Sequence, residues 1–193
     1  MSLAPWRTFL ARALHRNRSL VNARYCQLAT VRAEKMPANR TVVFRGFLGE
    51  TNTLKIVTDA RSEKAGQIES HPWGEICWYF PKTREQFRLF GELILVGENH
   101  GDEDLQKARQ IAWQELSDGA RVQFAWPEPG KTRASFEAFS PALPDAVEPL
   151  GHFCLLLLEP TKVEHLELRG EPQNRRIYEL DGEKLWREEE VNP

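Results

Sequence analysis

Residues 40–64 read RTVVFRGFLGETNTLKIVTDARSEK, and this stretch decides the fold. β-Branched and aromatic residues fill 40–48 and 53–58, and the GETN between them is a turn sequence, so two antiparallel strands are expected. A turn follows Thr58, and a short helix is expected to begin at Ser62. Lys64, in the first turn of that helix, lies at the positive end of the helix dipole, where a cation is unfavourable unless an anion binds beside it.

The start of this helix predicts an anion-binding site. Its first backbone N–H groups are unpaired and partly positive, and Ser62 can either cap the helix or donate its hydroxyl to the same anion. Arg40 opens the earlier strand and comes close to Thr58 if the strands pair as a meander. Taken singly, Arg40 and Lys64 are more often solvated surface charges and Ser62 a simple cap. Their combination favours the anion site.

The rest of the chain predicts a mainly β protein. Apolar, β-branched and aromatic runs between turn signals indicate further strands at 23–31, 74–80 and 86–96, two or more within 152–168, and a terminal hairpin over 175–191 turning at Asp181-Gly182. Helices are expected over 1–20 and 103–118, and the segment RVQFAWPEPGKTRASF (121–136) reads as irregular. We therefore predict one domain over 1–193, an antiparallel sheet closed into a barrel with flanking helices, whose core strands occupy 24–98 and 150–193.

Composition excludes several classes of partner. Of 193 residues, 41% are apolar and 28% charged, as in ordinary soluble proteins, and the net charge of -2 argues against nucleic acid and anionic membranes. No apolar run approaches a membrane span. Cys26, Cys77 and Cys154 are far apart and form no CxxC motif, so neither a disulfide nor structural zinc is expected and the protein is placed in the reducing cytoplasm.

Motifs for self-contained catalysis are absent. The sequence holds no GxGxxG, GxxxxGK[ST], HExxH or GxSxG motif. His152 and Cys154 alternate along a strand, but two ligands do not make a metal site, and the acidic loop 97–104 lacks the spacing of an EF-hand. No catalytic side chain and no metal site are predicted. The chain either takes its chemistry from a cofactor or performs none.

Four motifs follow one another in a characteristic order. RTVVFR (40–45) has the pattern R-x-V-x-x-[KR], and SEKAGQI (62–68) has the pattern S-x-K-x-x-Q-[IL] ahead of a proline. Gln86 opens a later strand, and Arg176 precedes the terminal hairpin. This ordered set, from about residue 24 to the C-terminus, resembles the pyridoxamine 5'-phosphate oxidase-related FMN-binding proteins.

The resemblance implies a split β-barrel of antiparallel Greek-key type that forms a homodimer with FMN between its subunits. Arg40, Ser62 and Lys64 would bind the FMN phosphate, which accounts for the cation at the helix start. Gln86 and Arg176 would reach the cofactor from the partner chain, although Arg175 is an alternative to Arg176. The backbone along the flavin would come from four residues of the two central strands: Val42, Val43, Val57 and Thr58.

The substrate site departs from the family pattern. Glu63 replaces a basic residue and Leu166 a tryptophan, and the positions expected to bind pyridoxamine phosphate hold other residue types: Trp113, Ser117, Arg121, Pro172 and Asn174. We therefore expect that FMN binding is retained and the vitamin B6 substrate is lost. Arg45, Trp126 and Lys131 are the candidate substrate residues, the last two in the loop 125–131, which could equally be a rigid closure of the barrel.

Three functions are consistent with these residues. The first is an FMN-dependent oxidoreductase with an unidentified substrate, and the second is a flavin-binding or flavin-storing protein of the same fold. The third is a barrel that binds single-stranded nucleic acid, which the charge of -2 disfavours. Flavin colour separates the first two from the third, and bleaching by a substrate separates the first from the second.

Overall fold

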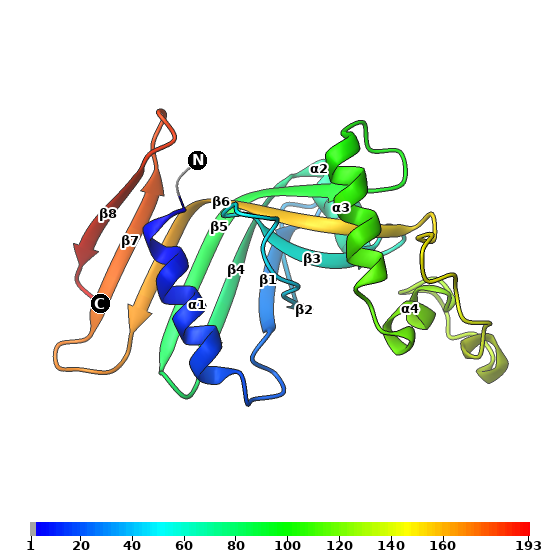
Figure 1. Cartoon of the computed structure of the whole chain (residues 1–193), viewed down its shortest axis with the longest axis horizontal. Coiled ribbons are helices and arrows are strands. Elements are labelled where there is room, and N and C mark those ends of the chain that lie inside the picture. Colours follow the sequence, from blue (N-terminus) through cyan, green and yellow to red (C-terminus); the bar gives the residue numbers. More distant parts are fainter. Residues whose placement is uncertain (1–2) are drawn as a thin grey trace.

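The computed structural model describes residues 3–193 and consists of one eight-stranded sheet with helices at its margins (Figure 1). The strands are β1 (Tyr25–Val31), β2 (Pro37–Val43), β3 (Leu54–Asp59), β4 (Trp73–Phe80), β5 (Glu85–Val96), β6 (Phe153–Glu167), β7 (Asn174–Leu180) and β8 (Trp186–Val191). The helices are α1 (Pro5–Asn17), α2 (Glu63–Ser70), α3 (Glu103–Gln114), α4 (Asp118–Phe124) and a 3-10 turn at Phe136–Phe139. None of these helices is long and apolar enough to cross a bilayer.

All strand pairs are antiparallel, in the order β2-β1-β4-β5-β6-β7-β8, with β3 added beside β6. The 15-residue β6 connects two parts of the sheet. Its first half pairs with β3 and its second half with β7, while β5 pairs with both halves. The strands β2-β1-β4-β5-β6-β3 thus form a barrel wall, and β7 and β8 extend from it (Figure 1).

The apolar run at the start of β6 is buried on both faces. Leu156 and Leu158 pack in the barrel core, whereas Leu155 and Leu157 pack in a second cluster beneath α3 with Trp113. A strand covered on both sides needs apolar residues at consecutive positions, which explains why this segment does not alternate.

The barrel is open along one seam. Backbone hydrogen bonds of 2.8 Å join Arg45 and Gly46 to Lys55, and Phe47 bridges Leu54. Beyond that point no ladder joins β2 to β3 within residues 3–193, because β2 pairs only with β1 and β3 only with β6. We call this opening the split. The predicted mainly β, antiparallel fold with flanking helices is confirmed, and the opening agrees with the expected split barrel. Over residues 3–193 the sheet is not closed into a barrel as predicted, and the meander expected for the first three strands is wrong at its last pairing.

Other expectations from the sequence need correction. The two or more strands expected within 152–168 are one strand, β6, because the strand runs on through Pro160, which pairs with Gly91 at a register shift in β5. The helix expected over 103–118 ends at Gln114. A second helix, α4, begins at Asp118 and runs to Phe124, into the segment 121–136 that was expected to be irregular.

Candidate functional site

The start of α2 holds a lysine among hydroxyl groups. The Lys64 Nζ donates to Thr58 Oγ1 at 2.7 Å and to Ser62 Oγ at 3.2 Å. Ser62 is the N-cap residue, but its side chain makes no capping bond and instead donates to the backbone oxygen of Asp59 at 2.7 Å. The first-turn N–H groups of α2 are therefore left without the side-chain acceptor that a serine cap normally supplies.

Arg40 lies beside the same helix. Its guanidinium donates to Thr30 Oγ1 at 2.6 Å and to Gln67 Oε1 at 2.9 Å, and Thr30 also donates to Gln67 at 2.6 Å. The strand β2 is thereby tied to α2. Arg40 is brought to the helix through Thr30 and Gln67, and not through the expected pairing of β2 with β3. Sequence reasoning assigned no role to Thr30 or Gln67, although Gln67 is part of the S-x-K-x-x-Q motif.

The two cations lack a compensating anion. Within residues 3–193, neither Lys64 nor Arg40 forms an ion pair with a carboxylate, whereas the neighbouring Arg61 pairs with Asp59 at 2.7 Å. Burial, and secondly the charge of Arg40, lowers the pKa of Lys64, and burial lowers the pKa of Arg40. Partly buried positive charge of this kind is stabilised by a bound dianion, so the site fits a phosphate group.

The backbone edges of the split lie next to this site. Val42 and Thr58 are buried, and Val43 and Val57 are half-buried, on the two strands that flank the opening. Because β2 and β3 each pair on one side only, the backbone groups that point into the split are available to a ligand. Unpaired strand edges beside a phosphate site suit a planar cofactor with polar edges, such as the flavin of FMN.

A pocket of about 450 Å³ joins the helix start to the loop after α4. Ser62 and Lys64 line it together with Trp126 and Lys131, so the structure brings these four predicted residues together. Arg45 does not line this pocket; it lies at the closed end of the seam, and its buried Nε has no partner within residues 3–193.

Gln86 lies on another part of the sheet. It lies opposite Tyr79 of β4 and opposite Leu166 of β6, and Leu166 in turn lies opposite Arg175 of β7. These side chains therefore share the face of the sheet opposite α1. We call Gln86, Leu166 and Arg175 the outer row. The strands β1 and β4 separate β2 from β5, so three strand spacings, about 14 Å measured along the sheet, lie between Gln86 and Arg40 in the same chain.

Arg176 points to the other face. Its row contains Phe87 and His165, beneath α1. Its guanidinium is already paired with Glu167 at 3.5 Å, Glu188 at 3.4 Å and Glu190 at 3.2 Å. Arg175, which the sequence left as the alternative, shares the face of Gln86 and pairs with Glu164 at 2.6 Å.

Two side chains at the positions expected to bind the vitamin B6 phosphate are buried and hydrogen-bonded within the protein. Trp113 is fully buried and donates its Nε1 to the backbone of Asp145 at 2.9 Å. Arg121 is buried, donates to the backbone oxygen of Leu116 at 2.7 Å and contacts Asp118. Both side chains therefore already have hydrogen-bond partners within the protein.

Comparisons with known proteins agree with this geometry. Residues 3–97 match the family described as pyridoxamine 5'-phosphate oxidase, FMN-binding domain. Pyridoxine/pyridoxamine 5'-phosphate oxidase 2 of Arabidopsis thaliana is 37% identical over 197 residues, covering 99% of this chain and 98% of that protein. An oxidase from Pseudomonas syringae pv. tomato is 26% identical over 196 residues, covering 98% of this chain and 87% of its own length.

Solved structures of similar proteins share this fold. A pyridoxamine 5'-phosphate oxidase-related, FMN binding protein from Nostoc punctiforme PCC 73102 is 60% identical, covers both chains fully and superposes with a TM-score of 0.98. PhzG from Burkholderia lata 383 has a TM-score of 0.80 at 18% identity, covering 97% of this chain and 92% of its own, and shows the shared fold. The predicted cofactor, FMN, is confirmed by the family match. This chain belongs to the pyridoxamine 5'-phosphate oxidase family of FMN-binding proteins.

Proposed function

We propose that this protein is an FMN-dependent oxidoreductase in which Arg40, Ser62 and Lys64 bind the cofactor phosphate. The observation that carries the proposal is the pair of uncompensated cations at the start of α2. Thr58 and Ser62 hold the ammonium of Lys64 in position through their hydroxyl groups. The guanidinium of Arg40, which donates to Thr30 and Gln67, adds a second positive charge beside the phosphate.

The backbone of four residues along the split would bind the edges of the flavin: Val42, Val43, Val57 and Thr58. When bound, FMN would supply redox chemistry between a substrate and an electron acceptor. The protein binds and orients the ring and limits the access of water, and no side chain of the site is assigned as an essential base. Free backbone edges on both sides of the opening support this arrangement.

We further propose a homodimer in which each subunit's outer row reaches the FMN of the other subunit. Two observations support this: by strand register the side chains of Gln86 and Arg40 point to opposite faces of the sheet, and three strand spacings, about 14 Å along the sheet, separate them. Arg175 replaces Arg176 in our assignment, because Arg176 faces α1 and is held by three glutamates.

The pocket beside Lys64 belongs, in this proposal, to the phosphate end of the cofactor. Trp126 and Lys131 line it with Ser62 and Lys64, so we assign them to that end rather than to the substrate. Arg45, whose buried Nε has no partner within residues 3–193, remains the substrate candidate. The three free cysteines support the placement in a reducing cytoplasm.

Replacing either cation tests the phosphate assignment. Arg40→Ala and Lys64→Ala should each weaken FMN binding about 10- to 100-fold, from the loss of about 1.5–3 kcal/mol of charge-assisted hydrogen bonding. Flavin absorbance after gel filtration and fluorescence titration of the apoprotein measure this. Lys107→Ala, on the exposed surface of α3, is the matched control and should bind FMN like the wild type. Full FMN affinity in both site variants would refute the assignment.

Turnover is tested with the compounds for which the relatives are named. The buried positions of Trp113 and Arg121 support the proposal that pyridoxamine 5'-phosphate and pyridoxine 5'-phosphate are not substrates. Under anaerobic conditions neither should bleach the bound flavin, and bleaching by either would identify a vitamin B6 oxidase. If no reductant in a broad panel bleaches the flavin, the second function, flavin storage, is favoured.

A further inference from the structure

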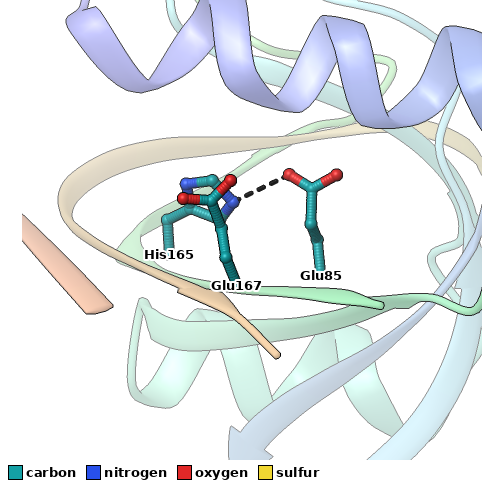
Figure 2. A group of neighbouring side chains, drawn as sticks. All are labelled: Glu85, His165 and Glu167. Carbon is teal, nitrogen blue, oxygen red and sulfur yellow. Dashed lines mark hydrogen bonds and ion pairs between the residues drawn. The ribbon is translucent and has the colours of Figure 1, made fainter. Parts of the chain in front are cut away.

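Three ionisable residues lie together beneath α1, outside the site described above. Figure 2 shows Glu85 on β5 pointing toward His165 on β6, with Glu167 beside them and the helix crossing over the group. Glu85 is 4% exposed and His165 1% exposed. One potential ligand atom from each of Glu85, His165 and Glu167 lies within 4.8 Å of the other two.

His165 is held by two kinds of contact. Its imidazole stacks on Phe87 with ring centroids 4.1 Å apart and packs against Phe9 of α1 at 5.4 Å. Its Nε2 is 2.9 Å from Glu85 Oε2, and its buried Nδ1 has no partner within residues 3–193. The bond to Glu85 is thus the polar contact that fixes the ring.

The group is a network of ion pairs and hydrogen bonds rather than an evident metal site. Glu167 lies 3.5 Å from the Nη1 of Arg176 and 3.8 Å from the Nη2 of Arg12. Burial raises the pKa of Glu85, but the hydrogen bonds from His165 and Thr83 and the charge of Arg12 more than offset it, so the pKa lies below its usual range. Glu167 therefore already has cationic partners from α1 and β7, and Glu85 has a hydrogen-bond partner from β6.

This network lies directly behind the outer row. Along β5, Glu85 precedes Gln86; along β6, His165 and Glu167 flank Leu166; along β7, Arg176 follows Arg175. Neighbouring residues of a strand point to opposite faces, so each member of the outer row is adjacent in sequence to a member of the inner network on the other face. A shift of one residue between these strands would exchange the two sets.

We infer that the Glu85–His165 pair positions the outer row. It fixes the backbone of the strands that carry Gln86 and Arg175, so that these side chains can reach the partner's flavin. The inference rests on the proposed function, since it is through Gln86 and Arg175 that the pair acts. Removing either Glu85 or His165 leaves the other buried without its hydrogen-bond partner. The strands β5 and β6 then shift so that the remaining polar group can find another partner. The outer side chains move with the backbone.

The test compares variants of the inner pair for FMN affinity and for the visible absorbance of the bound flavin. Glu85→Leu and His165→Phe each remove one partner, and the second keeps the stacking on Phe87. Each should weaken FMN binding about tenfold and shift the flavin absorbance band. Glu85→Gln keeps an acceptor for His165 and should restore most of the affinity. The double variant Glu85→Leu/His165→Phe should lose less than the sum of the single losses.

Controls separate this role from general stability. Lys162 and Glu179 form a 2.7 Å pair between the same strands β6 and β7, and removing it should leave FMN affinity and absorbance unchanged. Apoprotein unfolding is measured alongside, so that all binding is compared well below the unfolding midpoint. If Glu85→Leu does not fold, Glu85→Gln and His165→Phe carry the comparison.

Two different results would overturn the inference, and they distinguish its failure from the failure of the proposed dimer site. If Gln86→Ala and Arg175→Ala weaken FMN binding while Glu85→Leu and His165→Phe only lower the unfolding midpoint, the pair is structural alone. If Gln86→Ala and Arg175→Ala have no effect, the outer row does not contact the flavin, and the proposed dimer site fails together with the inference.

Discussion

Two cations in one short loop have opposite electrostatic surroundings. Arg61 is satisfied by Asp59, whereas Lys64, three residues later, is surrounded by hydroxyl groups that cannot neutralise it. The first contact stabilises the turn itself. The second leaves positive charge beside unpaired helix N–H groups, an arrangement that gains free energy when an anion binds.

At the same scale, buried thiols should make stability fall in alkali. Burial raises the pKa of Cys26 to about 12 and that of Cys154 to about 11, against 9.0 in the unfolded chain. The unfolded state therefore loses these protons first, and the stabilisation, full below pH 9, is lost as pH rises toward the folded values. Each thiol should cost about 1.4 kcal/mol per pH unit in that range.

Urea unfolding between pH 8 and 10 measures this loss, with the double variant Cys26→Ala/Cys154→Ala as the comparison. The variant should be less stable at pH 8, but its stability should fall much less on going to pH 10. The lowered pKa of Lys64 acts in the opposite direction in both proteins, so it cancels in the difference. Equal pH dependence in the two proteins would contradict the prediction.

Among the elements, β5 and β6 decide how the barrel is built. Their register shifts between Phe90 and Gly91, opposite Pro160, and this irregularity separates the half of β6 that pairs with β3 from the half that pairs with β7. A Cβ on Gly91 would lie 2.0 Å from the backbone oxygen of Glu159, so the two strands can approach only at a glycine.

Gly91→Ala should therefore destabilise the fold by about 3 kcal/mol, because a backbone atom and not a flexible side chain must move. Gly66→Ala is the matched control within the same chain. Gly66 lies inside α2 with open space around its Cα, so alanine there should raise stability by about 0.8–1 kcal/mol through helix propensity. Urea midpoints measure both. A Gly91→Ala protein as stable as the wild type would show that the strands can separate at no cost.

For the whole molecule, the two faces of the sheet differ in what covers them. The helix α1 lies across one face (Figure 1) and buries Trp6, Leu10 and Ala13 against the core. On the opposite face, large aromatic side chains stay exposed in the single chain, with Trp73 and Phe90 stacked 5.4 Å apart. An aromatic surface beside the outer row is where a second subunit would pack in the proposed dimer.

Tyr79→Asp should therefore give a monomer with much weaker FMN binding. Tyr79 is 47% exposed and aligns with Gln86, so a charge there would be buried without a partner in the dimer. Light scattering gives the mass, and flavin absorbance gives the cofactor content. Val21→Asp, at a position 94% exposed after α1, should remain a dimer with FMN. A wild-type monomer that holds FMN stoichiometrically would refute the shared site.

The sequence alone determined the strands and the cation-rich helix start, because these signals are local. Residues 40–64 contain two strands, a turn and a helix start within 25 positions, and their propensities and motif spacings agree with one another. The family and its cofactor followed from the order of such local motifs. Thr30, by contrast, could not be connected to Arg40 before the pairing of β1 with β2 was known.

Only the tertiary structure decided which side chains face each other across long separations. Arg175 and Arg176 are adjacent and chemically identical, yet one lies in the outer row and the other beneath α1. A shift of one residue in strand register reverses that choice. The register depends on pairing with β5 and β6, and Glu85 meets His165 across 80 residues of chain. Local propensity cannot predict which face of the sheet each side chain takes, because the strand register depends on how differently the two faces are buried.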